Sequence, residues 1–106
     1  MTDRIIQTLS LAKKAGMVSS GESAVLSDIR GFKSYLVLIA EDASGGTKKK
    51  IIDKCAFYEV PYYIYGTKES MAHAIGKEMR SFVSVNDSNF AEKIISRLEE
   101  SDRNGK

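Results

Sequence analysis

The 106-residue chain has one cysteine, one histidine and no long hydrophobic run. Cys55 has no second cysteine to pair with, so an intrachain disulfide and a cysteine metal cluster are excluded. His73 stands without a cysteine or acidic cluster, which makes a poor metal site, and we expect neither metal nor cofactor. The longest apolar run, residues 35 to 40, is far too short to span a bilayer. The N-terminus starts with polar residues and an acid rather than an apolar segment, so we expect a cytoplasmic protein without a membrane partner.

Patterns typical of enzymes are also missing. Cys55 falls on the apolar face of a predicted helix, which favours a buried structural thiol over a nucleophile. Residues 44 to 50, SGGTKKK, follow an apolar strand and open a helix, as a phosphate-binding loop does, but the required Gly-x4-Gly-Lys-Ser/Thr spacing fails. We therefore expect no catalytic residue. A nucleotide-binding or hydrolytic domain built on residues 45 to 48 is an alternative that absence of ATP or GTP binding would remove.

The charge of the chain is small but uneven. The formal net charge is +2, with 42% hydrophobic and 28% charged residues, a composition ordinary for a globular protein. Residues 1 to 50 carry eight Lys or Arg against five Asp or Glu, whereas residues 51 to 106 carry eight against nine. This distribution suits a nucleic-acid site only if that site is local and shaped. A chance asymmetry of the solvated surface is the alternative.

Helix and strand patterns alternate along the chain. Apolar residues spaced three and four apart predict helices over residues 3 to 15, 22 to 30, 47 to 58, 68 to 75 and 90 to 99. Runs rich in β-formers predict strands at residues 35 to 40, 62 to 65 and 82 to 85, with a short edge strand or extended link at residues 17 to 20. Alternation of this kind implies the α/β class, as a three-layer α/β/α sandwich around a four-stranded mixed sheet. We expect one domain over residues 1 to 100 and a disordered tail over residues 101 to 106.

Three loops are expected to gather at one end of this sandwich: residues 19 to 23, 41 to 47 and 76 to 81. The first presents backbone N–H groups at a helix N-terminus, which attract phosphates. The third combines Lys77 and Arg80, both expected to be exposed, with the apolar Met79, a mixture that suits a splayed-out nucleotide. The alternative is that Met79 packs inward and the charges only solvate the loop.

Four segments carry a family resemblance: LSLAKKAGMVSSGESAV, LVLIAEDAS, TKKKIIDKCAFYEVPYY and HAIGKEMRSFVSV. In their order and spacing they resemble the bacterial YlxQ-like family, which belongs to the kink-turn RNA-binding superfamily of ribosomal proteins (the L-seven-Ae type). The resemblance covers about residues 4 to 98. It implies an α/β/α sandwich without catalytic activity. It also implies a structured RNA partner, ribosomal or linked to translation, that contains a kink-turn, a sharply bent internal loop built on tandem sheared G·A pairs.

The resemblance includes one departure at the family's Gly-x-Asn-Glu motif, whose Asn and Glu read guanine edges. Gly21 matches the motif glycine and Glu22 the variable position, but Ser23 stands in place of Asn and Ala24 in place of Glu. Each lost base contact costs about 1–3 kcal/mol of discrimination. The RNA therefore either differs from the family's usual kink-turns or is recognised by shape and phosphates.

The expected RNA-binding residues come from five segments. Glu41 and Asp42 match the family's acidic pair after a strand, and residues 77 to 80 match its base-covering loop. Basic residues at the ends of two neighbouring helices flank this surface. The full set is Lys13, Lys14, Ser20, Gly21, Glu22, Ser23, Ser27, Glu41, Asp42, Lys48, Lys77, Glu78, Met79 and Arg80. We expect a monomer, and a protein–protein interaction module on the same fold is the alternative function.

Overall fold

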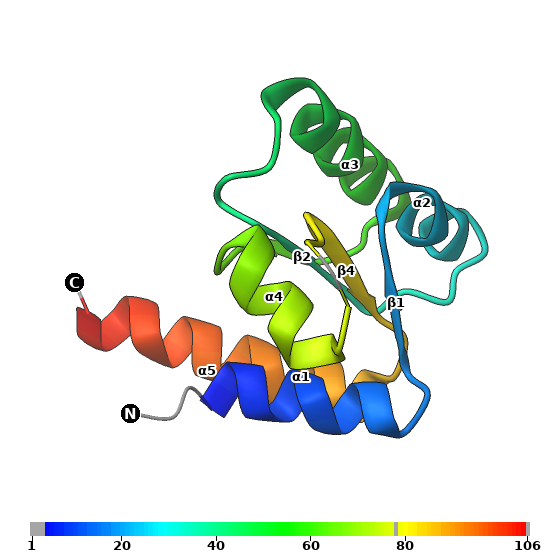
Figure 1. The fold of residues 1–106 in the computed structure, drawn as a ribbon. Helices are drawn as coiled ribbons and strands as arrows, with labels where there is room; N and C mark the ends of the chain where they lie inside the picture. The colour runs from blue at the N-terminus through cyan, green and yellow to red at the C-terminus, as the bar shows by residue number, and fades with distance from the viewer. Residues whose placement is uncertain (1–3, 78, 106) are drawn as a thin grey trace.

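The computed structural model describes residues 4 to 77 and 79 to 105, with side chains to residue 100 (Figure 1). Five helices and four strands alternate in these residues. Their order is α1 (Arg4–Lys14), β1 (Val18–Ser20), α2 (Glu22–Arg30), β2 (Leu36–Ile39), α3 (Gly45–Tyr58), β3 (Tyr62–Ile64), α4 (Lys68–Ile75), β4 (Phe82–Val85) and α5 (Ser88–Gly105).

The four strands form one mixed sheet in the order β1-β4-β2-β3. β4 pairs antiparallel with both β1 and β2, and β2 pairs parallel with β3. The predicted α/β fold with a four-stranded mixed sheet is confirmed, and residues 18 to 20 form the edge strand rather than an extended link.

Side chains of the central strand β2 divide between two apolar cores. Leu36 and Leu38 pack among residues of α1, α4 and α5, whereas Val37 and Ile39 pack among residues of α2 and α3. Because successive residues of a strand point to opposite faces, this division places three helices on one face of the sheet and two on the other. Figure 1 shows the same arrangement, with α2 and α3 on one side of the strands and α1 and α5 on the other. The three-layer sandwich is thereby confirmed.

Most helix boundaries follow local signals in the sequence. α2 and α4 begin and end where they were predicted, and the side chain of Thr67 caps α4 by accepting a hydrogen bond from the backbone N–H of Ser70. α3 begins at Gly45, two residues before the predicted start. α5 differs more, because it continues to Gly105 where the sequence predicted an end at residue 99 and a disordered tail from residue 101. The polar residues 101 to 104 contain no glycine or proline, so the first helix-breaking residue is Gly105.

A buried polar network fixes α2 against the sheet. Ser84 of β4 is fully buried, and its Oγ lies 2.7 Å from Ser34 Oγ and 2.6 Å from Asn86 Oδ1. The amide of Asn86 donates to the carboxylate of Asp28 on α2 at 2.8 Å and to Ser19 Oγ on β1 at 3.2 Å. Hydrogen bonding removes the cost of burying these groups. The position of the last turn of α2 is therefore set by polar as well as apolar contacts.

None of the helices in the described part of the chain is both long and apolar enough to cross a membrane.

Candidate nucleic-acid interface

The three loops expected to gather do meet around one hollow of about 320 Å³. Each loop contributes residues to its wall, and the first residue of α4 completes it. The lining residues are Gly21, Glu22, Ser44, Thr47, Lys68, Met79, Arg80, Ser81 and Phe82. Seven of these nine are polar, charged or glycine. The hollow is therefore a polar concave surface formed by segments far apart in the sequence.

Helices α2, α3 and α4 all begin at this hollow. Gly21, Ser44 and Thr67 are the N-cap residues of the three helices. Gly21 has φ of 93°, a conformation that residues with a side chain rarely adopt, and its N–H donates to the carbonyl of Phe82 at 2.9 Å. β1 therefore turns directly into α2 and leaves the first turn of that helix facing the hollow.

The helix N-termini give the hollow a positive potential without requiring many cations. The first N–H groups of a helix have no partner inside the helix, and the helix dipole adds partial positive charge there. Neither α2 nor α3 has a hydrogen bond to an N-cap side chain. The N-cap of α2 is Gly21, which has no side chain, and at α3 Ser44 Oγ donates to Thr47 Oγ1 at 3.0 Å instead. Such N-termini attract phosphate and base acceptor atoms. The hollow can therefore hold anionic groups although the chain has a net charge of only +2.

The acidic pair after β2 supports the walls of the hollow. Asp42 Oδ1 accepts a hydrogen bond from the backbone N–H of Lys68 at 2.9 Å. The backbone carbonyl of Glu41 accepts from Lys48 Nζ at 3.3 Å. The Asp42 carboxylate thus connects the start of α4 to the loop after β2 by a hydrogen bond. Lys48 stabilises the same loop through its hydrogen bond to Glu41.

Arg80 connects the third loop to the first. Its Nε donates to Ser20 Oγ and its Nη1 to the carbonyl of Met79, both at 3.2 Å. Its backbone N–H donates to the carbonyl of Lys68 at 3.3 Å. Arg80 is half-buried, so the expectation of an exposed side chain is wrong, because the hydrogen bond to Ser20 draws the guanidinium against β1.

Met79 points away from the core. Its side chain is 57% exposed at the edge of the hollow, which decides against the alternative in which it packs inward. An exposed thioether beside Arg80 offers an apolar surface next to a cation, as a splayed base with its phosphate requires. Glu78, between Lys77 and Met79, lies outside the described residues.

An ion pair neutralises the one carboxylate among the described residues of the wall. Glu22 Oε2 lies 3.0 Å from Lys50 Nζ, which reaches it from α3. Both side chains are about half exposed, so the pair adds little stability. Its consequence is electrostatic, because an unpaired carboxylate at this position would repel a phosphate.

Nine of the described expected residues lie outside the wall of the hollow. Four of them support the wall through the contacts given above: Ser20, Glu41, Asp42 and Lys48. Ser23 and Ser27 are exposed one turn apart on α2, and Lys77 is exposed just after α4. The other two, Lys13 and Lys14, lie at the end of α1, and β1 separates them from Gly21. Lys13 is half-buried. Lys14 lines a separate hollow together with Ile6, Gln7, Ser10, Leu11, His73 and Ala74.

Sequence reasoning did not single out Ser44, Thr47, Lys68 or Ser81, which do line the hollow. Ser44, Thr47 and Ser81 lie within the loops that were expected to meet, so their position in these loops was the sequence signal that could have identified them as site residues. Lys68 was placed only as a helix residue, and its contribution depends on the long-range hydrogen bond with Asp42.

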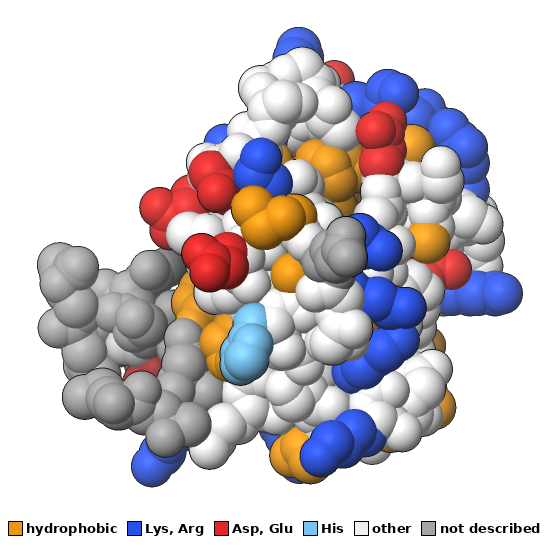
Figure 2. All heavy atoms as spheres, in the orientation of Figure 1, with side chains coloured by type: hydrophobic (Ala, Val, Ile, Leu, Met, Phe, Trp, Pro, Cys, Tyr) orange, Lys and Arg blue, Asp and Glu red, His pale blue; other side chains and the backbone are white. Residues whose placement is uncertain are grey.

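Charges are unevenly distributed on the face that Figure 2 shows. Most Lys and Arg side chains lie on the side over α2 and β1, with a few Asp or Glu side chains among them, and further Asp and Glu side chains gather on the opposite side, near the start of α4. This uneven distribution favours approach of an anionic partner from the side over α2 and β1.

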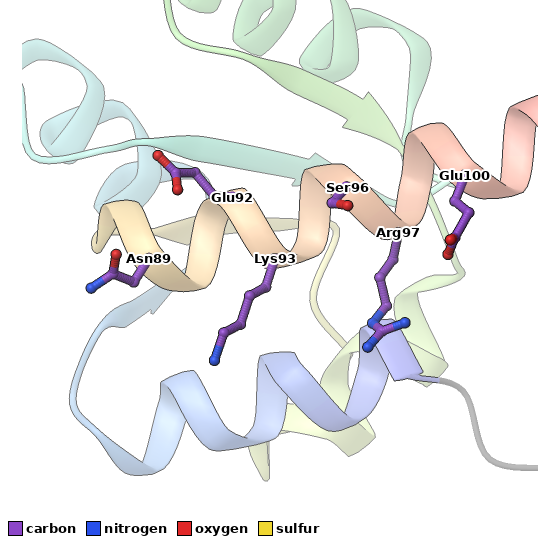
Figure 3. Close-up of a pocket in the computed structure, with 6 residues that line it drawn as sticks. All are labelled: Asn89, Glu92, Lys93, Ser96, Arg97 and Glu100. Carbon is purple, nitrogen blue, oxygen red and sulfur yellow. The ribbon is translucent and has the colours of Figure 1, made fainter.

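A further hollow, of about 520 Å³, lies on a single helix (Figure 3). Its lining comes entirely from α5 and is polar or charged: Asn89, Glu92, Lys93, Ser96, Arg97 and Glu100. Mixed charges at helical spacing are typical of a solvated helix surface. Among the described residues, no three His, Cys, Asp or Glu side chains come together as metal ligands would.

The fold and the hollow define a class of protein, a small α/β/α domain in which three helix N-termini meet at one polar concave surface. Residues 3–95 match the model of the ribosomal protein L7Ae/L30e/S12e/Gadd45 family, and the chain belongs to this family.

Curated relatives and solved structures agree with that assignment. The RNA-binding protein YlxQ of Bacillus subtilis is 46% identical over 91 residues, 86% of this chain and 91% of that protein. The RNA-binding protein YlxQ of Enterococcus faecium is 36% identical over 96 residues, 91% of this chain and 92% of that protein. A protein of unknown function from Bacillus halodurans superposes with a TM-score of 0.89 at 31% identity, covering 92% of this chain and 99% of that one. The 15.5kD RNA binding protein of Giardia lamblia, at 18% identity and a TM-score of 0.76 over 94% of this chain and 92% of that one, shares the fold.

Proposed function

We propose that the protein binds structured RNA and that the hollow between α2, α3 and α4 is its binding surface. The observation that carries this proposal is the convergence of three helix N-termini on one polar concavity, with Arg80 and Met79 at its wall. The curated relatives are named RNA-binding proteins, and the chain matches them over most of its length. A polar lining also favours RNA over an apolar protein segment as the occupant.

The RNA feature that fits best is a sharp bend or internal loop, the kink-turn being the example that family membership suggests. A concave site 320 Å³ in volume receives a protruding element rather than the side of a straight duplex. Ser23 and Ala24 replace the residues that the family motif uses on guanine edges, so shape and phosphate contacts carry more of the recognition here. We propose that the partner is ribosomal RNA or another RNA linked to translation, that the protein acts as a monomer in the cytoplasm, and that it performs no catalysis.

Calorimetric titration tests this function. A kink-turn RNA and a straight duplex of the same length and base composition are titrated into the full chain under identical salt conditions. We expect the kink-turn to bind at least about tenfold more tightly, since only the bent backbone places phosphates at the helix N-termini. Equal affinity for the two RNAs would show that shape is not recognised. Sequencing RNA that co-purifies with the protein then identifies the natural partner.

A further inference from the structure

A cluster of exposed aromatic side chains lies at the other end of α2 and α3 from the hollow. α2 ends at Arg30, just before Phe32, and α3 ends with Phe57 and Tyr58. The Phe32 and Phe57 rings each meet Tyr58 edge-on, with ring centroids 5.6 and 5.0 Å apart. We call Phe32, Phe57 and Tyr58 the aromatic cluster. Both phenylalanines are more than three-quarters exposed, so their rings add little to the core, against which Tyr58 packs.

The backbone at Phe32 is held in an unfavourable conformation. Its φ is 58°, in the left-handed region that is uncommon for any residue with a side chain and an outlier for a bulky one. A glycine there would satisfy the turn without strain, and Gly31 precedes it. The chain therefore places a large apolar ring in solvent on a strained backbone, a combination that packing does not explain and that is typical of binding positions.

Cations flank the aromatic cluster in the sequence, on α2, on α3 and just after α2. Arg30 and Lys33 are exposed on either side of Phe32 in the sequence, and Lys54 precedes Tyr58 by one turn of α3. The nearby Asp53 pairs with Lys49 at 3.2 Å. In Figure 2, Lys and Arg side chains line the edge of the molecule over α3 and α2.

Carboxylates lie on the other side of the cluster. A hollow of about 400 Å³ borders Phe32 and Tyr58, and its wall includes Glu59 and Glu92 together with Tyr35 and Pro61. A ligand here thus meets cations along one edge, aromatic rings in the middle and hydrogen-bond acceptors along the other edge.

We propose that the aromatic cluster, with Arg30, Lys33 and Lys54, binds an unpaired, single-stranded segment of RNA. Phe32 and Phe57 are 76% and 77% exposed, so their rings are accessible for bases to stack on. The cations neutralise the strand's phosphates, while Glu59 and Glu92 accept hydrogen bonds from base amino groups. This inference rests on the proposed function, because the strand is a continuation of the RNA held at the hollow.

The cations beside the aromatic cluster favour an RNA strand over a protein as its partner. An apolar peptide would gain little from three flanking cations, whereas an anionic strand with flat apolar bases uses both components of the surface. The hollow and the aromatic cluster lie at opposite ends of the same two helices, about 14 Å apart along the nine residues of α2 at 1.5 Å per residue. A strand leaving the hollow therefore needs to extend by only a few nucleotides.

Fluorescence anisotropy with three labelled RNAs tests the proposal. The probes are a blunt-ended kink-turn, the same kink-turn with a single-stranded adenylate extension of about eight nucleotides, and that adenylate oligonucleotide alone. The protein is the full chain, as wild type and as the double variant Phe32→Ala with Phe57→Ala. Leu11→Ala is the matched control, because Leu11 is an exposed apolar residue on α1, 57% accessible, and lines neither the RNA-binding hollow nor the hollow beside the aromatic cluster.

We expect the extension to tighten kink-turn binding by about tenfold, and the double variant to lose that gain while keeping wild-type affinity for the blunt kink-turn. The adenylate alone should bind the wild type and Leu11→Ala at least about tenfold more tightly than the double variant. An extension without benefit, or a benefit that survives the double variant, would overturn the proposal and point to a protein partner. If the blunt kink-turn fails to bind, the proposed function fails, and the adenylate alone still decides the role of the aromatic cluster. Unchanged thermal unfolding of both variants shows that the fold is intact.

Discussion

The carboxylate of Asp42 holds the first residue of α4, with Oδ1 of Asp42 lying 2.9 Å from the backbone nitrogen of Lys68. The carbonyl of Lys68 in turn accepts the backbone N–H of Arg80 at 3.3 Å. Two segments that line the hollow are thus connected to the loop after β2 through one residue. Asp42, expected from family resemblance to contact RNA, has a positioning role in this structure.

Replacing Asp42 should therefore destabilise the protein. Asp42→Ala leaves a helix N-terminal N–H without its side-chain acceptor, and we expect the free energy of unfolding to fall by about 1 kcal/mol. Asp42→Asn keeps an acceptor oxygen and should retain most of that stability. Glu41→Ala is the control, because Glu41 uses only backbone atoms in its contacts with Lys48 and Gly66. Urea denaturation measures all three, and an equal loss for Asp42→Ala and Glu41→Ala would contradict the assignment.

Charge reversal in the third loop should abolish RNA binding. Lys77→Glu with Arg80→Glu changes the local charge by four units beside the helix N-termini, and we expect no measurable binding of a kink-turn RNA. Lys77→Glu alone should leave stability unchanged because its side chain is exposed. Arg80→Glu should cost about 1 kcal/mol, since it removes the hydrogen bond to Ser20.

The control for this pair lies on α5. Lys93→Glu with Arg97→Glu makes the same change of charge on the helix surface shown in Figure 3, on the other face of the sheet from α2 and α3. Gel-shift titration compares the two double variants. RNA binding that persists in the first, or is lost equally in both, would mean that the site is elsewhere or that only net charge matters.

The salt dependence of binding reports how many phosphates are contacted. If the hollow and its flanking cations neutralise about three to five phosphates, affinity should fall roughly as the third or fourth power of salt concentration. Titrations with kink-turn RNA at several salt concentrations give this slope. If the logarithm of the affinity hardly changed with the logarithm of the salt concentration, the helix N-termini at the hollow would not be contacting phosphates, which would contradict the proposal.

Much of the fold follows from sequence because its signals are local. The fully apolar β2 predicted a strand covered on both faces, and Thr67 predicted the start of α4. Helix α5 ran past its predicted end because no local signal stops a helix before Gly105. The pairing order β1-β4-β2-β3 joins strands distant in the chain and has no local signal at all.

The candidate site was predictable as a set of loops but not as a set of contacts. Nothing local in the sequence links Arg80 to Ser20, Lys50 to Glu22 or Asp42 to Lys68. Each of these contacts depends on packing between elements far apart in the chain. Lys14 illustrates the same limit. Its sequence position near the first loop predicted that it flanks the hollow, but the packing of α1 places it in the wall of another hollow.

Removing the partner of Glu22 should weaken RNA binding more than it weakens the fold. Lys50→Gln leaves the Glu22 carboxylate unneutralised at the hollow, and we expect binding to weaken about three- to tenfold at low salt, with the difference shrinking at high salt. Stability should change by less than about 1 kcal/mol, because both side chains are substantially exposed. Lys49→Gln, whose partner Asp53 lies outside the hollow's wall, is the matched control.

A double-mutant cycle sharpens this test. Glu22→Gln combined with Lys50→Gln removes the repelling carboxylate together with its partner, so affinity should return toward the wild-type value. If the double variant binds as weakly as Lys50→Gln alone, Lys50 contacts RNA directly rather than neutralising Glu22.

The buried thiol of Cys55 should make stability depend on pH in the alkaline range. Burial in the core between α2, α3 and the sheet raises the pKa of the Cys55 thiol from 9.0 to about 11. Between these values the unfolded chain has released the thiol proton and the folded protein has not, so the unfolded state binds fewer protons. The free energy of unfolding therefore falls as pH rises from about 9 to about 11, by about 2 kcal/mol in total from this group.

Comparison with Cys55→Ala isolates this contribution, because the titrations of Lys and Tyr are common to both proteins. The variant is less stable near neutral pH owing to the small cavity it leaves, but it lacks the thiol. Urea denaturation across the alkaline range should therefore show the two stabilities converging above about pH 9. A difference that stays constant across this range would mean that the folded protein opens around Cys55 readily enough for the thiol to ionise as it does in the unfolded chain.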